Sequence, residues 1–128
     1  MKEFVQLKKA IIHKPAPDVL MTSYKSDVHI TEEDAMEIDQ AHLTMAQGSD
    51  MFVLVDLAAT NPGFDKAAED YFVHKGKMIP FTKAIAIVTE HKSSFFARVF
   101  GVATRTLYPT KEFDSIEKAT VWFDSLRK

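Results

Sequence analysis

Two short apolar runs constrain the fold of this 128-residue chain more than any other feature of its sequence. Phe52–Val55 is apolar at every position and ends in Asp56, and Lys83–Thr89 is apolar at its five central positions. Strands that are apolar at successive positions are typical of sheets that are buried on both faces, and such sheets are mostly parallel. We therefore predict that both runs form central, parallel strands of an α/β domain.

The first 24 residues predict an antiparallel hairpin. Phe4–His13 is a β-like run, and Val19–Tyr24 has the composition of a second strand. Lys14–Asp18 lies between them and contains two prolines, which fix the backbone and remove hydrogen-bond donors. We therefore expect the chain to turn at this segment and the two strands to pair as a hairpin.

Four segments carry the signals of helices. The first is expected to begin at Thr31, which can cap a first turn rich in acidic residues, to run to about Gln47 and to stop at Gly48. The second is expected to end near Gly76. The predicted caps of the remaining helices are Asp65, Ser93 or Ser94, and Asp114. The positions expected to be buried are Ala35, Ile38, His42 and Met45 in the first helix, and Ile116, Ala119, Trp122, Phe123 and Leu126 in the last.

The elements follow one another in the order β-β-α-β-α-β-α-β-α. The last strand is expected within Tyr108–Phe113, where a proline limits its length. Strict alternation of strands and helices after the hairpin indicates a mostly parallel sheet with helices packed against it. No linker, repeat or low-complexity stretch interrupts the chain, so we expect residues 1–128 to form one domain.

Composition excludes several classes of site. The chain has no cysteine, which excludes disulfides, thiolate metal sites and a cysteine nucleophile. Its four glycines are too far apart to form a G-x-G or P-loop phosphate cradle. No pair of its five histidines has the spacing of a helical zinc motif. We therefore expect neither a cofactor nor a metal ion.

Charge and hydropathy limit the location and the partners of the chain. The formal net charge is −2, so no strong basic field is present to attract nucleic acid. The sequence contains no run of about 18 apolar residues that could span a membrane, and its first residues have no secretory signal. The expectation is a cytoplasmic protein that binds no nucleic acid and does not span a membrane.

The element order resembles that of the STAS or SpoIIAA-like domains of anti-sigma-factor antagonists. Phe52–Leu57, followed by a loop of small residues, is similar to the central strand of that family and its terminal aspartate. Val28–Ala35 and Tyr108–Thr110, followed by Phe113, resemble a group of small bacterial STAS-like proteins. The resemblance covers the whole chain in element order and implies a SpoIIAA-like fold and a regulatory role through protein contacts.

The segment that would carry the functional residue departs from the family's pattern. Antagonists of that family have a phosphorylatable serine in an Asp-Ser-Ser-Gly-like segment that enters the second helix, whereas residues 60–65 contain no serine here. Thr60 has the one hydroxyl of this segment, and it is either a phosphoacceptor or a loop residue that hydrogen-bonds to its own turn. Asp56, Thr60, Asn61 and Asp65 are the candidate regulatory residues.

Two other features suggest alternative sites. Asp56, Thr89 and Lys111 resemble the acid, hydroxyl and lysine of receiver domains, but the first strand ends without the acidic pair that would hold Mg²⁺ in such a domain. The predicted third helix has an unusually wide apolar stripe. If one edge of this stripe is exposed, it could bind a partner, a second copy or an apolar ligand. Its central residues are Phe95, Phe96, Val99 and Phe100.

The sequence therefore predicts a non-enzymatic, cytoplasmic STAS-like domain that acts through protein contacts, and a homodimer is one form that these contacts could take. The expected contact surface is the loop after Asp56, the start of the second helix and an edge of the third. The first alternative is a binder of a small apolar, lipid-like ligand. Weaker alternatives are a receiver-like phosphoacceptor at Asp56 and an enzyme that pairs Asp56 with a histidine.

Overall fold

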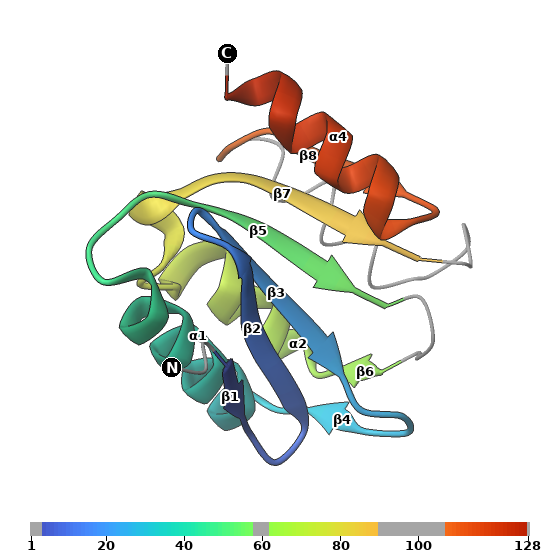
Figure 1. Cartoon of the computed structure of the whole chain (residues 1–128). Helices are drawn as coiled ribbons and strands as arrows, with labels where there is room; N and C mark the ends of the chain where they lie inside the picture. The colour runs from blue at the N-terminus through green and yellow to red at the C-terminus, as the bar shows by residue number, and fades with distance from the viewer. Residues whose placement is uncertain (1–3, 58–61, 90–106, 128) are drawn as a thin grey trace.

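A six-stranded sheet forms the centre of the computed structural model, which describes residues 4–57, 62–89 and 107–127 (Figure 1). The strand order is β1-β2-β3-β5-β7-β8. β1, β2 and β3 pair antiparallel, whereas β3, β5, β7 and β8 pair parallel. The predicted mostly parallel sheet with an N-terminal antiparallel hairpin is confirmed. The bounds are β1 Phe4–Gln6, β2 Ala10–Ala16, β3 Val19–Tyr24, β5 Met51–Asp56, β7 Thr82–Val88 and β8 Thr110–Phe113.

The N-terminal hairpin differs from the prediction in where it turns. β2 continues through Pro15 to Ala16, so the turn to β3 is only Pro17 and Asp18. The sheet accepts Pro15 because this residue is exposed and the β2–β3 register is irregular between His13 and Ala16, where a ladder hydrogen bond is not required. The predicted first strand is also two strands, because the chain reverses between β1 and β2.

Helix α1 (Glu32–Ala46) has the ends that its sequence predicts. The Asp34 N–H donates to Thr31 Oγ1 at 3.3 Å, and the Asp34 carboxylate accepts the Thr31 N–H at 2.9 Å, which completes a capping box. Gln47 has a φ of 52° and Gly48 a φ of 80°, and this left-handed backbone ends the helix. All four positions predicted to be buried on α1 are buried.

The second helical segment ends at Gly76, as predicted, but it changes type along its length. α2 (Lys66–Asp70) continues directly into the π-helix η1 (Tyr71–Lys75). A short 3-10 helix, η2 (Ile79–Phe81), then leads into β7. The predicted third helix lies outside the described residues.

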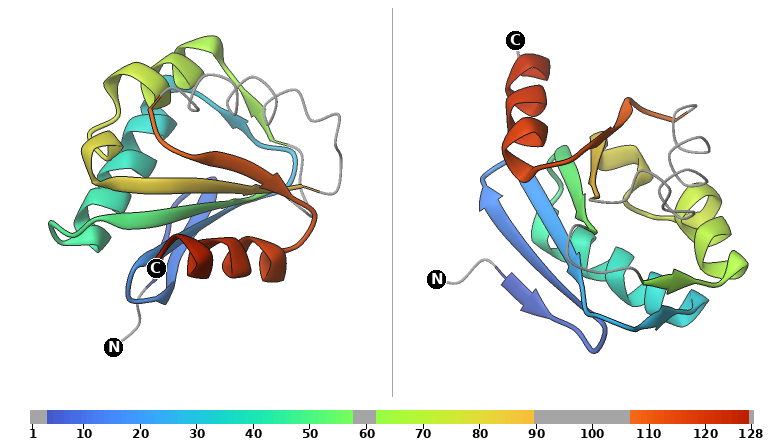
Figure 2. Two further views of the ribbon diagram at one scale, coloured as in Figure 1. Left: turned by 90° about the horizontal axis from the view of Figure 1, so that it is seen from above. Right: turned by 90° about the vertical axis from the view of Figure 1, so that its right-hand side faces the viewer.

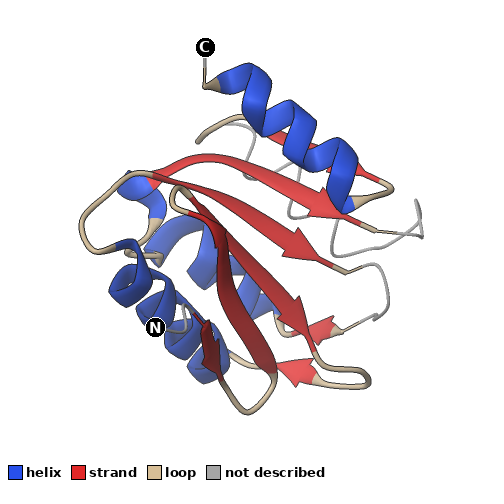
Figure 3. Cartoon of the chain, viewed as in Figure 1, coloured by secondary structure: helices blue, strands red, loops and turns tan. Residues whose placement is uncertain are grey.

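Helices cover both faces of the sheet (Figures 2 and 3). α1 and α2 lie on one face, and the buried residues between them and the sheet include Leu20, Ile38, Val53 and Ile85. α4 (Ile116–Leu126) lies on the other face, where Phe123 stacks on Phe52 with ring centroids 4.7 Å apart. Alternate residues of β5 thus face different helices, which explains why this strand is apolar throughout.

α4 departs from its prediction at the cap and at the ends of its buried face. Ser115 is the N-cap, not Asp114, because the Asp114 carboxylate is paired with Lys118 Nζ while the Ser115 hydroxyl accepts the Lys118 N–H. Ala119 and Phe123 are buried as predicted. Ile116 and Leu126, which were expected to be buried, are each 40% exposed. None of the described helices is long and apolar enough to cross a bilayer.

A second, two-stranded sheet was not predicted. β4 (His29–Ile30) pairs in parallel with β6 (Gly63–Phe64). Such short strands give no periodic signal in a sequence. This small sheet joins the start of α1 to the start of α2, because each helix follows directly after one of its strands. It therefore fixes the position of the α2 start next to the end of β3 (Figure 1).

Candidate functional site

The carboxyl ends of the parallel strands lie together at one end of the large sheet, beside β4 and β6 (Figure 2). We call this line of strand ends the carboxyl edge. The register places Ser23, Asp56, Val88 and Phe113 side by side on four successive strands. Ligands of open α/β sheets bind outside the carboxyl ends of the strands, so this edge is the candidate site.

Asp56 is the polar end of an otherwise buried strand. The five preceding residues of β5 and the following Leu57 are all buried, whereas Asp56 is half-buried. The Ser23 hydroxyl donates a long hydrogen bond of 3.5 Å to Asp56 Oδ2 from the neighbouring strand. The strand thus presents a carboxylate at the carboxyl edge, and the residues on either side of Asp56 in the sequence are buried.

Asp65 lies at the same end of the molecule and pairs with His29. Its carboxylate contacts His29 Nε2, and it makes no side-chain capping hydrogen bond to α2 although it occupies the N-cap position. The side chains of His29 and Asp65 are 60% and 44% exposed. Asp65 is therefore the N-cap residue, as predicted. Its carboxylate contacts His29 of β4 and does not accept a hydrogen bond from the first N–H groups of α2.

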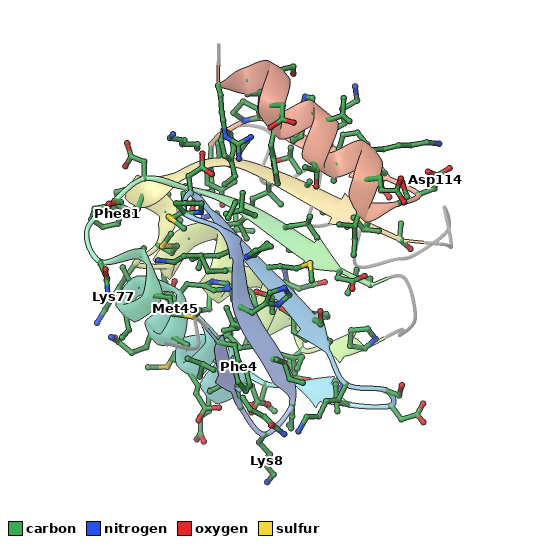
Figure 4. The ribbon with its side chains drawn as sticks, in the orientation of Figure 1. Phe4, Lys8, Met45, Lys77, Phe81 and Asp114 are labelled. Atoms are coloured by element: carbon green, nitrogen blue, oxygen red, sulfur yellow. The ribbon has the colours of Figure 1, made fainter. Side chains whose placement is uncertain are left out.

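An open pocket of about 240 Å³ continues the edge toward α4. The described residues that line it are Thr89, Glu112, Phe113, Asp114 and Lys118. Asp114 lies in the turn between β8 and α4 (Figure 4). Glu112 and Lys118 were not predicted as site residues, because their proximity depends on how β8 pairs with β7 and on where α4 packs.

A buried polar cluster lies away from this edge, between α1 and the sheet. His42 Nε2 is 2.6 Å from Thr22 Oγ1, and both residues are buried. Burial lowers the pKa of His42 to about 4, although nearby Asp39 acts in the opposite direction. The imidazole is therefore neutral at pH 7, and His42 is buried as its place on the apolar face of the helix predicts.

Asp39 is the second member of this cluster, and it is 3% exposed. Its carboxylate accepts the Tyr71 hydroxyl at 2.8 Å and the backbone N–H groups of Lys77 and Met78 at 2.8 and 3.1 Å. Helical spacing could have identified Asp39, because it lies four residues after Ala35 and three before His42 on the buried face. The small pocket beside Asp39 and His42 has a volume of about 40 Å³, which suits a few water molecules.

The predicted site residues fall into two groups. Asp56 and Asp65 lie at the carboxyl edge, whereas Thr60, Asn61, Phe95, Phe96, Val99 and Phe100 are outside the described residues. Thr89 follows β7 at this edge, but the Lys111 ammonium lies over the Phe113 ring, 5.7 Å from its centroid. In the part of the chain that the structure describes, no group of three or more His, Asp or Glu side chains could hold a metal ion.

Comparison of the structure with solved structures supports the fold. It is similar to the crystal structure of an uncharacterised protein of the DUF3478 family with a SpoIIAA-like fold, from Shewanella loihica PV-4. The TM-score is 0.63 at 18% sequence identity, and the match covers 95% of this chain and 94% of that one. The predicted SpoIIAA-like fold is thereby confirmed.

Sequence comparison identifies the family. No curated protein matches the chain. A family model described as a domain of unknown function, DUF7793, matches residues 14–127. This range includes β3, β5, β7 and β8, which supply the candidate edge, and all of the described helices. The chain therefore belongs to the DUF7793 family.

Proposed function

We propose that this chain is a non-enzymatic regulatory domain that binds a protein partner at the carboxyl edge of its parallel strands. The observation that carries the proposal is the half-buried carboxylate of Asp56 at the end of a buried strand. A rigid strand holds this charge at the place where α/β folds bind their ligands. The small β4–β6 sheet holds Asp65 at the same edge, so two carboxylates flank the loop that joins them.

The exposure of this edge favours recognition over catalysis. Its histidine–carboxylate pair, His29 and Asp65, has both side chains more than two-fifths exposed. General acid–base and electrostatic catalysis gain most of their strength in sites that exclude water. An exposed pair whose two side chains contact each other instead fixes the shape of a surface, which is what a protein-binding domain requires.

The missing serine defines how this domain would differ from the antagonists that it resembles. Thr60 has the one hydroxyl between Asp56 and Asp65, so regulation by phosphorylation would depend on it. A phosphate there would add negative charge to a segment that follows one carboxylate in the sequence and precedes another. We therefore propose that the unmodified edge is the state that binds the partner.

Site-specific photo-crosslinking in the organism that encodes the chain tests this proposal. A photoreactive amino acid is placed at Ser26, in the turn after β3, or at Ala67, an exposed residue in the first turn of α2. The matched control positions are Met36 on α1 and Val121 on α4, which are 52% and 67% exposed. We expect both edge positions to give the same protein adduct, and Asp56→Asn to weaken it.

The controls decide the outcome. An adduct that forms equally from positions 36 and 121 would place the contact elsewhere and would overturn the proposal. The absence of any adduct from both edge positions, in variants that still unfold cooperatively, would overturn it as well. An adduct with twice the mass of the chain would support the proposal and identify the partner as a second copy.

A further inference from the structure

One half of the large sheet is uncovered on the face that packs against α4. The helix contacts β5, β7 and β8, and no described helix covers β1, β2 and β3 on that face (Figure 2). Ala10, Ile12 and Thr22 are buried toward α1, whereas their sequence neighbours that face the other way are partly exposed. We call this uncovered face the open strip, and its side chains are Phe4, Gln6, Ile11, His13, Met21 and Ser23.

The composition of the open strip is that of an interface core. Half of its side chains are apolar, and none is Asp, Glu, Lys or Arg. Protein interfaces are about as apolar as the rest of the surface, but their cores are depleted of charged residues. Phe4 is 43% exposed, in register with His13 and Met21 on the neighbouring strands (Figure 4). A protein can therefore cover the open strip without burying an unpaired carboxylate, ammonium or guanidinium.

The two sides of the open strip differ in charge. On the α4 side, Arg127 binds the β2–β3 turn, so the flank of the helix that includes Arg127 faces β3. Asp124, Thr120 and Glu117 precede Arg127 at helical spacings on this flank, and all three are exposed. On the opposite side, the exposed Lys8 lies in the turn after β1 (Figure 4). Glu117 and Lys8 thus flank the open strip with opposite charges, both at its carboxyl end, where α4 begins and β1 ends.

We propose that the open strip packs against the open strip of a second copy of this chain, about a two-fold axis parallel to the strands. Each β1 then lies beside the α4 flank of the other copy, and Lys8 of each copy lies near Glu117 of the other. Sheets that pack face to face are about 10 Å apart, which is also about the diameter of a helix, so α4 fits beside the β1 of the other copy. The contact uses a different face from the proposed function and does not depend on it.

Sedimentation velocity of the full chain tests the contact. We expect the average mass to rise from 14.5 kDa toward twice that value over roughly a hundredfold range of concentration, since dimer formation follows mass action. Phe4→Glu places a carboxylate in the open strip and should weaken the dimer by about tenfold or more. Met36→Glu is the matched control. Met36 is 52% exposed on α1, on the other face of the sheet, so this change should leave the dissociation constant unaltered.

An exchange of charges tests how the two copies are oriented. Lys8→Glu and Glu117→Lys should each weaken the dimer by about fivefold, because the pair occurs twice in a two-fold contact. The double variant reverses both charges and keeps the pair, so its dissociation constant should return to within about twofold of that of the unaltered chain. Circular dichroism checks that each variant is folded.

The measurements also define how the inference fails. A mass of 14.5 kDa at every concentration would overturn it and would leave the open strip to a partner of another sequence. Equal dissociation constants for Phe4→Glu and the unaltered chain would place the dimer contact elsewhere, and a double variant as weak as the single ones would reject the two-fold arrangement. None of these results would change the photo-crosslinking outcome at Ser26 and Ala67.

Discussion

The guanidinium of Arg127 and the carboxylate of Asp18 form two parallel hydrogen bonds across 109 positions of sequence. Nε lies 2.7 Å from Oδ2, and Nη2 lies 2.8 Å from Oδ1. The same guanidinium lies over the Phe52 ring, with its central carbon 5.2 Å from the ring centroid. Arg127 therefore fastens the end of α4 to the β2–β3 turn and to the core of that face.

Replacement of Arg127 should weaken this attachment. Arg127→Lys keeps the charge but loses the two-point geometry, so we expect the free energy of unfolding to fall by about 1 kcal/mol or less, and by about 1–2 kcal/mol for Arg127→Ala. Urea denaturation measures both. Lys66→Ala is the control, because its pair with Asp70 lies at 3.5 Å on an exposed helix surface and should contribute less than about 0.5 kcal/mol. Equal losses for Lys66→Ala and Arg127→Ala would contradict the attachment.

The regular elements were predictable because their signals are local. Thr31 and Gly48 delimit α1 through capping and backbone conformation, and the buried run before Asp56 requires a central strand. The errors arose where tertiary contacts decide between close alternatives. Ser115 replaces Asp114 as the cap of α4 because Asp114 pairs with Lys118, and Pro15 stays within β2 because its edge of the ladder is irregular.

The candidate site was predictable only in part. Asp56 could be identified from its place after an apolar run, and Asp65 from its place before a helix. The partners of these residues could not, since His29 reaches Asp65 through the two-residue strands β4 and β6. The pocket at Glu112 depends on the register of β8 against β7, which no local pattern contains.

Asp39 should be among the most sensitive polar positions of the described chain. Asp39→Ala leaves the Tyr71 hydroxyl and two backbone N–H groups without their acceptor in a buried place, so we expect a loss of about 3 kcal/mol or more in the free energy of unfolding. Tyr71→Phe removes one of these hydrogen bonds and should cost about 1 kcal/mol. The control is Tyr24→Phe, since Tyr24 is buried and the described residues contain no hydrogen-bond partner for its hydroxyl. The role of Asp39 would be refuted if Asp39→Ala cost no more than Tyr71→Phe.

His42 should make the stability of the protein depend on pH. Its pKa in the folded state is about 4, below the ordinary value of 6.5, so the unfolded chain takes up a proton first as the pH falls. The free energy of unfolding should therefore decrease through the window from 6.5 to 4, by about 2 kcal/mol at pH 5. His42→Gln removes this titration and keeps a partner for Thr22. We expect it to flatten the difference between urea unfolding at pH 7.5 and at pH 5, whereas His74→Gln, at an exposed position, should not. Identical pH dependence in His42→Gln and the unaltered protein would contradict the assignment.

Gly63 should be required for the contact between β4 and α2. A Cβ atom at this position would lie 2.8 Å from His29 Nδ1, too close for the present ring position. Gly63→Ala should therefore displace the imidazole from Asp65, at a cost of about 1 kcal/mol or less because both side chains are largely exposed. A double-mutant cycle with His29→Ala measures the cause. If the ring is the obstacle, Gly63→Ala should cost about 0.5 kcal/mol less in the His29→Ala background than in the unaltered protein. An equal cost in both backgrounds would mean that the loss of stability comes from the backbone of β6 and not from the His29 ring. It would then give no reason to expect that Gly63 controls the position of Asp65.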